Sequence, residues 1–289
     1  RQTSDGYFDK SGHNYSHAVA TYAVSEAYAM TRIPTLRPAM EGGVTRIVEG
    51  AQIAKMPRKG SMAPVPGVDQ GSSISCAFWD YNYKQSGRHD LSYVGWQVQA
   101  LKAAKLAGST NEKLKATLGM AANGIKSVQS PTNGRFNYSN AAGSGSAPMT
   151  GVGVLGLQLM GHGESDEVRN GLQAIADLPC SFTDATTKNM FYMWYYVTQA
   201  KFHKKGTTWK SWNKQFQKTL VTGQNKDGSW TGPDKDAHEA KYGTAYTTTL
   251  GALTLMVYYR NLPTFKAEAL KSDPMDQVNN DGDVEVDIF

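Results

Sequence analysis

Two kinds of helical stretch alternate along this sequence, which restricts the fold to layers of helices. Stretches of the first kind are apolar on nearly every side, as expected of helices with protein all around them. Stretches of the second kind carry one apolar stripe at spacings of three and four, as expected of helices at the surface. The first kind covers residues 18–30, 94–107, 152–160, 190–197 and 250–259, and the clearest stripes lie in 36–51, 114–128 and 209–220.

The order of these stretches predicts an all-α fold with two concentric layers. Apolar and striped helices alternate through four pairs, and a fifth apolar helix ends the series. Side chains that can cap free backbone N–H groups lie near the expected helix starts. Asp90, Thr150 and Asp184 precede apolar stretches, and Asn111 and Ser165 precede striped ones. We therefore expect one large helical domain, although 289 residues at about 150 per domain would suggest two.

Three segments fall outside this helical pattern. Residues 53–89 contain Pro57, Pro64 and Pro66 among several glycines and predict an inserted loop. Residues 137–148 predict a shorter polar loop, and the chain becomes acidic after Pro263. We expect a helical domain over residues 1–265, with the insertion at about 53–89, followed by an acidic C-terminal tail over 266–289.

The composition excludes several classes of protein. The 30 Lys and Arg exceed the 25 Asp and Glu by five, but this charge is spread thinly, which argues against a nucleic-acid partner. No apolar run reaches the length of a membrane span, which leaves peripheral membrane contact open. Two cysteines, Cys76 and Cys180, are too few for a disulfide scaffold. Because Arg1 is not methionine, we expect a processed or truncated chain, which favours an exported or cell-envelope protein.

Three turns share a pattern of glutamine, glycine and an aromatic residue. Glutamine can bond the open carbonyls at a helix end, glycine permits a left-handed turn, and the aromatic side chain packs the turn onto its neighbour. The helices start at intervals too uneven for a strict solenoid. The three repeats are Gln2-x3-Gly6-x-Phe8, Gln129-x4-Gly134-x-Phe136 and Gln224-x3-Gly228-x-Trp230.

These turns resemble the QW motif of squalene and oxidosqualene cyclases and the related repeats of protein prenyltransferase β subunits. Over residues 1 to about 265 the chain is similar to bacterial prenyltransferase or squalene-oxidase-repeat proteins. This resemblance implies an α/α toroid, a double ring of inner and outer helices, whose centre holds an isoprenoid. Five inner helices are visible where six are usual, so a sixth pair is expected upstream of Arg1. The similar stretches are NYSHAVATYAVSEAYAMT, DLSYVGWQVQALKAAKLAG, NMFYMWYYVTQAKFH and GTAYTTTLGALTLMVYYRNLP.

The reactive motifs of those families are missing from this sequence. Class II cyclases protonate an alkene with an Asp-x-Asp-Asp motif, and the nearest matches, which begin at Asp234 and Asp281, lack its fourth position. Protein prenyltransferases bind zinc through Asp-x-Cys and a histidine, but neither cysteine follows an aspartate at that spacing. His13 and His17 fit capping or packing better than metal binding. No metal and no cofactor are expected, and whether the protein is an enzyme stays open.

Aromatic residues on the apolar helices are the remaining feature that bears on chemistry. Aromatic faces stabilise cations by about 0.5 to 2 kcal/mol each, and they also fill cores or bind lipids and sugars. Asp90, Asp184 and His89 are candidate catalytic groups at the rim, with helix capping and solvation as the alternatives. The candidate substrate-binding residues are Tyr93, Trp96, Tyr192, Trp194, Tyr195 and Tyr246.

Three functions fit these observations. The leading one is a cyclase-like toroid that binds an isoprenoid or similar lipid in its central cavity. The alternatives are a non-catalytic protein-interaction module of a longer envelope protein and a polysaccharide-active toroid enzyme. A run of lysines predicts a solvated helix face rather than a membrane contact. This run comprises Lys201, Lys204, Lys205, Lys210, Lys214 and Lys218.

Overall fold

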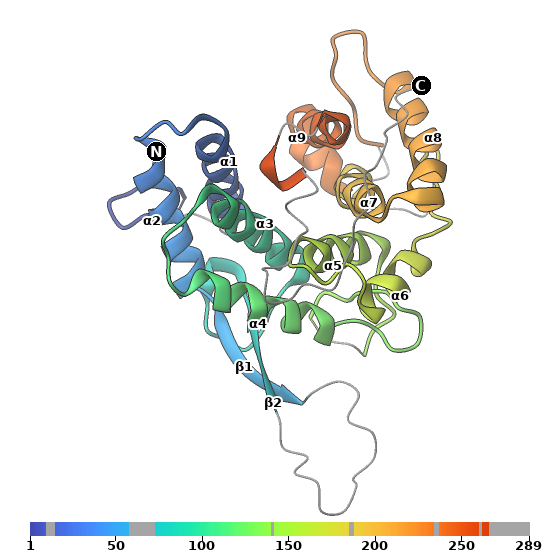
Figure 1. Ribbon diagram of the computed structural model, residues 1–289. Coiled ribbons are helices and arrows are strands. Elements are labelled where there is room, and N and C mark those ends of the chain that lie inside the picture. Colours follow the sequence, from blue (N-terminus) through green and yellow to red (C-terminus); the bar gives the residue numbers. More distant parts are fainter. Residues whose placement is uncertain are drawn as a thin grey trace, which may run out of the picture.

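The chain folds mainly into helices, as the computed structural model shows for residues 1–9, 15–57, 73–139, 142–184, 188–233, 237–259 and 262–265 (Figure 1). The predicted all-α character is confirmed. His13, Asp234, Asp281 and the tail 266–289 lie outside the described residues. The α-helices are α1 (Tyr15–Thr31), α2 (Leu36–Glu49), α3 (Leu91–Ala107), α4 (Leu114–Ser127), α5 (Ala147–Leu159), α6 (Asp166–Ala174), α7 (Met190–Lys204), α8 (Gly206–Thr222) and α9 (Ala237–Leu255). Two strands, β1 (Gln52–Pro57) and β2 (Ser73–Phe78), and three 3₁₀ helices, η1 (Tyr81–Tyr83), η2 (Met256–Tyr258) and η3 (Pro263–Phe265), complete the described elements.

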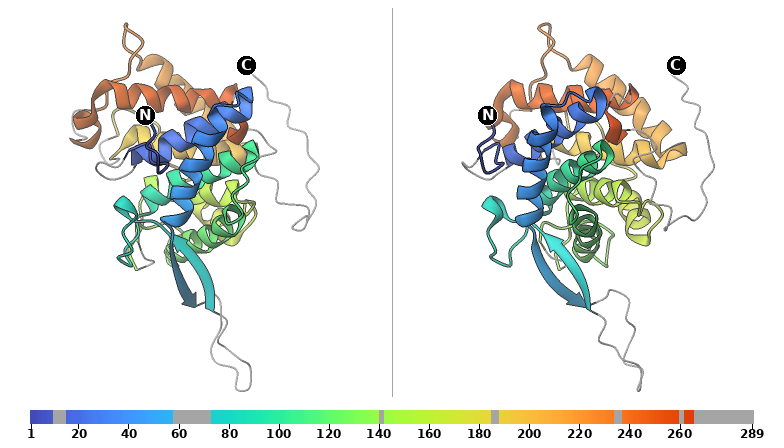
Figure 2. Two further views of the ribbon diagram at one scale, coloured as in Figure 1. Left: turned by 90° about the vertical axis from the view of Figure 1, so that its left-hand side faces the viewer. Right: turned by 60° about the vertical axis from the view of Figure 1, so that its left-hand side comes forward.

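The odd-numbered helices pack against one another in chain order, from α1 through α3, α5 and α7 to α9 (Figures 1 and 2). Each of α2, α4, α6 and α8 packs on the odd-numbered helix that precedes it. Nearly all residues of α3, α5 and α7 are buried, whereas α2, α4 and α8 bury one side. The apolar and striped helices of the sequence correspond to these two groups, because a helix with neighbours on several sides leaves no face for water.

A β-hairpin separates α2 from α3 and projects from the helical body (Figure 1). β1 pairs antiparallel with β2, with Gln52 opposite Phe78. The predicted loop over 53–89 is therefore wrong where these strands lie. β2 packs on α4, where Asn123 Nδ2 donates to the carbonyl of Ser75 at 3.0 Å. This contact joins segments far apart in sequence, so local propensity carries little sign of it.

Two of the predicted helix caps are confirmed. Asp90 Oδ1 accepts a hydrogen bond from the N–H of Ser92 at 2.9 Å and caps α3. Ser165 Oγ accepts from the N–H of Val168 at 3.4 Å and caps α6. Asn111 accepts from Lys113 N at 3.1 Å in the turn just before α4.

Two other predicted caps are wrong. α5 starts earlier than expected, so Thr150 lies inside the helix and Ser146 is its cap. A proline in the first turn permits this earlier start, because its missing N–H needs no partner there. α7 starts after Asn189, so Asp184 is too far upstream to cap it and lies in the preceding turn, with its N–H bonded to Ser181 O.

Both cysteines are buried free thiols. Burial raises the pKa of Cys76, and it raises the pKa of Cys180 to about 12. Within the described ranges, no helix combines the length and the apolar character needed to cross a bilayer.

Candidate functional site

Three turns repeat one geometry: turn 1 (residues 2–8), turn 2 (129–136) and turn 3 (224–230). In each turn the glutamine Nε2 donates to the carbonyl of the turn's glycine, at 2.9, 2.8 and 2.8 Å. The N–H of the aromatic residue donates to a side chain on the next odd-numbered helix, at 3.1 Å in all three turns. All three glycines have positive φ. The acceptors on the next helices are His17, Thr150 and Thr248.

Turns 1 and 2 each hold an even-numbered helix in place. The second N–H of Gln2 Nε2 donates to the carbonyl of Ala39 in α2, and that of Gln129 donates to Glu167 in α6, both at 2.8 Å. The glycine of each turn lies against the backbone of the same helix, three residues after the carbonyl that binds the glutamine. A Cβ at Gly6 would come within 2.7 Å of the Gly42 carbonyl oxygen, and one at Gly134 within 2.8 Å of that of Asn170. Only glycine fits at either contact.

Turn 3 has the same internal bonds but no such helix among the described residues. Gln224 Nε2 donates only to Gly228 there, and a Cβ at Gly228 would meet nothing closer than Gln224 Nε2 at 4.0 Å. Other side chains hold the turn in shape. Asn225 Nδ2 donates to Ser229 Oγ and Thr231 Oγ1, both at 2.9 Å.

A segment around the β-hairpin shares one contact with turn 3. Trp79 Nε1 donates to the carbonyl of Ile47, near the end of α2, at 2.8 Å. Trp230 Nε1 makes the matching 2.8 Å bond to Leu220, near the end of α8. Both carbonyls belong to the third residue from the helix end. Gln52, at the start of β1, also follows a striped helix, but its Nε2 donates to the carbonyl of Arg88 at 2.7 Å instead of to a turn glycine.

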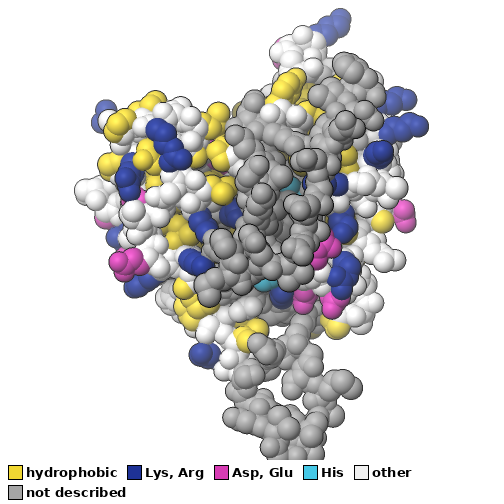
Figure 3. Space-filling view, viewed as in Figure 1, with side chains coloured by type: hydrophobic (Ala, Val, Ile, Leu, Met, Phe, Trp, Pro, Cys, Tyr) yellow, Lys and Arg dark blue, Asp and Glu magenta, His cyan; other side chains and the backbone are white. Residues whose placement is uncertain are grey.

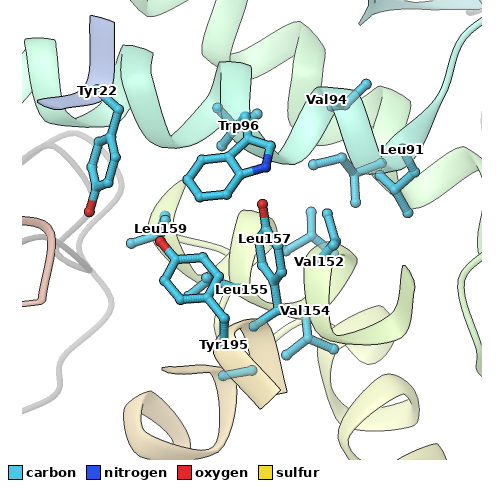
Figure 4. Close-up of a cluster of buried hydrophobic side chains, with 14 of the residues drawn as sticks. Tyr22, Leu91, Val94, Trp96, Val152, Val154, Leu155, Leu157, Leu159 and Tyr195 are labelled. Atoms are coloured by element: carbon cyan, nitrogen blue, oxygen red, sulfur yellow. The ribbon is translucent and has the colours of Figure 1, made fainter. Parts of the chain in front are cut away.

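The candidate substrate-binding residues separate into four groups of ring contacts. Trp96 and Tyr195 stack at a centroid distance of 5.4 Å, and Tyr22 of α1 lies 6.4 Å from Trp96 (Figure 4). Tyr192 adjoins this group through Tyr196, at 4.8 Å. These rings come from α1, α3 and α7, and we call Tyr22, Trp96, Tyr192, Tyr195 and Tyr196 the aromatic cluster.

The other three candidates make their ring contacts with residues outside the aromatic cluster. Tyr93 packs edge-on against Tyr15 at 5.1 Å, next to η1. Trp194 packs against Phe182 at 5.1 Å, and its indole N–H has no hydrogen-bond partner among the described residues. Tyr246 of α9 contacts Tyr242 at 5.4 Å. The sequence could not separate these positions, because α7 is buried on every side.

The aromatic cluster is closely packed. Trp96 is 7% exposed, Tyr22 5% and Tyr195 fully buried. The Tyr195 hydroxyl donates to Gln99 Oε1 at 2.7 Å, and burial raises the pKa of Tyr195. At one edge the Tyr22 hydroxyl lies 2.8 Å from Thr264 Oγ1 of η3. The cluster therefore forms a hydrogen-bonded core in this conformation.

The carboxylate of Asp90 holds the loop before α3 rather than facing open space. Tyr81 donates to its Oδ2 at 2.8 Å, and Arg88 lies 3.5 Å from the same oxygen. Arg88 also pairs with Asp80, and both aspartates are buried. The bond to Tyr81 and the cap of α3 give Asp90 a structural role.

The other two candidate catalytic groups, His89 and Asp184, make different contacts from those of Asp90. The ring of His89 stacks on Phe78 of β2 at 4.0 Å, and burial lowers the pKa of His89. Within the part of the chain that the structure describes, its Nε2 has no hydrogen-bond partner. Asp184 lies in the turn before α7, as described above. Among the residues that the structure describes, no three His, Cys, Asp or Glu side chains gather in a way that could hold a metal ion.

Lys201 is an exception to the predicted solvated lysine face. Lys210, Lys214 and Lys218 are exposed, but Lys201 is only 2% exposed. Its Nζ donates to the carbonyl of Ala176, just after α6, at 3.0 Å, and lies 4.4 Å from the centre of the Trp212 ring. Burial lowers the pKa of Lys201 to about 8. A cation at a helix C-terminus and over an indole has two favourable partners, which offset part of the cost of burial.

Stability is expected to rise with pH where Lys201 titrates. The pKa in the folded protein, about 8, lies below the ordinary lysine value, so between the two the unfolded chain binds more protons. The free energy of unfolding should therefore gain on the order of 1 kcal/mol from this residue between pH 7 and 9.5. Urea unfolding of the wild type and Lys201→Met over this range measures the difference. A constant difference between the two proteins would contradict the assignment.

A surface depression of about 570 Å³ lies beside turn 1 and α2, lined by Gln2, Asp5, Thr35 and Arg46 among others. It is on the outside of α2, away from the aromatic cluster. On the face seen in Figure 3, apolar side chains are visible over the part occupied by α1 and α2, with Lys and Arg beside them. No family model matches the chain, and no curated protein matches it either.

Proposed function

We propose that the helices form an α/α toroid, with the odd-numbered helices as its inner ring. The serial contacts from α1 to α9 support this arrangement, as do the even-numbered helices that cover them. The shared geometry of turns 1 and 2, each linking an inner helix to the outer helix that follows, gives further support.

We propose that this toroid is a non-catalytic module that binds another protein. The uncovered apolar face of α1 carries this proposal. α1 is apolar on nearly every side, yet Val19 is 39% and Met30 54% exposed, and Ala23 between them is also exposed. Residues 19, 23 and 30 share one side of a helix. Contiguous apolar surface of this kind is typical of a binding face.

The inner helix at the other end of the series supports the same function. On α9, Ala245, Thr249 and Ala252 are exposed and lie on one side. Small side chains on a helix let another backbone approach closely. The candidate acid Asp90, by contrast, takes part in structure, since it caps α3 and accepts from Tyr81.

A photo-crosslinking amino acid at position 19 or 30 tests the binding face of α1 in the cells that make the protein. We expect both positions to form covalent adducts with one and the same protein, identified by mass spectrometry. Position 210, on the solvated side of α8, is the control and should form none. If positions 19 and 30 give no adduct, or the same background as 210, the proposal fails.

An isoprenoid or similar lipid in the centre of the toroid is the second candidate function, and the aromatic cluster favours it. Trp96, Tyr195 and Tyr22 come from three helices and present the type of surface that binds apolar or cationic carbon skeletons. Lipid extraction and mass spectrometry of purified protein, with incubation with squalene and prenyl diphosphates, test this function. A protein free of lipid that yields no product would eliminate it.

A further inference from the structure

We propose that turn 3 and the adjoining side of α9 form a docking site for an α-helix of a partner protein. This inference rests on the proposed binding function and specifies the kind of partner. It comes from comparing turn 3 with turns 1 and 2, whose helices are in place. Its test is separate from the crosslinking at α1, so either can fail alone.

Turns 1 and 2 show what a docked helix contacts. In each docked helix, one backbone carbonyl accepts from the glutamine of the turn. Four residues after that carbonyl the helix has a glycine, which packs on the inner helix. A Cβ at Gly43 would lie 2.5 Å from Thr21 of α1, and one at Gly171 would lie 2.6 Å from Val154 of α5. Thr21 and Val154 are fully buried beneath these helices.

The equivalent positions are open at turn 3. In turns 1 and 2, His17 and Thr150 accept the backbone N–H of the aromatic residue. Thr21 comes four residues after His17, and Val154 comes four residues after Thr150. On α9 that acceptor is Thr248, so the matching residue is Ala252, which is exposed. The second N–H of Gln224 and the open side of Gly228 lie on the same turn. Among the described residues, no helix makes at turn 3 any of the three contacts seen in turns 1 and 2.

Turn 3 has a backbone shape similar to that of turns 1 and 2, although no described helix packs against it. Gly228 has φ +86°, compared with +89° for Gly6 and +72° for Gly134. Asp227 Oδ1 accepts from the N–H of Ser229 at 3.0 Å and from its hydroxyl at 2.7 Å. These bonds lower the pKa of Asp227 and favour a fixed turn. A preformed site loses little conformational entropy on binding.

The occupant is a helix from another protein rather than one of the described helices of this chain. The even-numbered helices of the structure already pack on the inner helices before them. A second copy would offer the same helices, with α2 and α6 already covered by their own turns. The partner helix needs a free carbonyl in its first turn and a small residue four positions later.

A peptide copy of α6 provides the probe. Residues 163–177, made as a capped peptide, carry Glu167 and Gly171 at the required spacing. In NMR titrations of the full-length ¹⁵N-labelled protein, we expect the side-chain amide of Gln224 and the backbone amide of Gly228 to shift in a saturable way. Gln224→Ala should weaken peptide binding at least fivefold, and so should Ala252→Glu, which alters an exposed position. Gln215→Ala, an exposed glutamine on α8, should bind as the wild type does.

The opposite outcomes are equally distinct. No saturable shift at Gln224 and Gly228, or equal binding of a peptide with Gly171→Leu, would overturn the proposal. Self-association in sedimentation experiments that Gln224→Ala abolishes would assign the site to a second copy instead. Shifts of the Gln224 amide when residues 266–289 are removed would assign it to the tail. Either result would also overturn the proposed partner, while leaving the crosslinking test at α1 unaffected.

Discussion

Replacing Gly134 with alanine is expected to lower the free energy of unfolding by about 3 kcal/mol, from two effects that add. Gly134 has φ +72°, where a Cβ is strained by about 1 to 2 kcal/mol. The new Cβ would also come within 2.8 Å of the carbonyl oxygen of Asn170. That neighbour is the backbone of α6, which can give way only if the helix moves. Urea unfolding followed by circular dichroism measures the loss.

Gly228→Ala is the matched control for this change. Gly228 has nearly the same positive φ, but its Cβ would enter open space. Only the backbone strain then applies, so we expect a loss of about 1 to 2 kcal/mol. Equal losses at positions 134 and 228 would show that the contact with α6 contributes nothing. The difference between them thus isolates the contribution of helix docking.

The helices could be predicted because their pattern is repeated and local. A helix such as α4, striped with Leu114, Leu118 and Ile125, contains in its own sequence the information on which side is buried. The turns could be found for the same reason, since glutamine, glycine and the aromatic residue lie within eight positions. The strands of the hairpin could not, because β2 depends on packing against α4, which comes later in the chain.

The candidate site was harder to predict than the fold. On a helix buried all round, periodicity gives no preferred side, so Tyr195 in the aromatic cluster and Trp194 beside Phe182 looked equivalent. Lys201 was misassigned for a related reason. It is at the end of an apolar helix beside exposed lysines, and only the structure shows the carbonyl of Ala176 and the ring of Trp212 around it.

Trp79→Ala is expected to cost about 3 to 5 kcal/mol, the range for a large aromatic side chain removed from a core. Trp79 is fully buried, and its indole N–H is bonded to Ile47 of α2. That carbonyl is among the last four of the helix, which have no partner within the helix. The change thus removes packing and also leaves a buried acceptor unpaired. Urea unfolding would measure both losses together.

Trp79→Phe separates the two contributions, because it keeps most of the packing but removes the N–H. We expect it to cost about 1 to 2 kcal/mol, the value of a buried hydrogen bond whose acceptor is left unpaired. Trp230→Phe in turn 3 should cost a similar amount, since Trp230 makes the same bond to Leu220. If Trp79→Phe were neutral while Trp230→Phe was costly, the two indole bonds would not be equivalent. Similar losses would instead show that the two indole bonds stabilise the ends of α2 and α8 to the same extent.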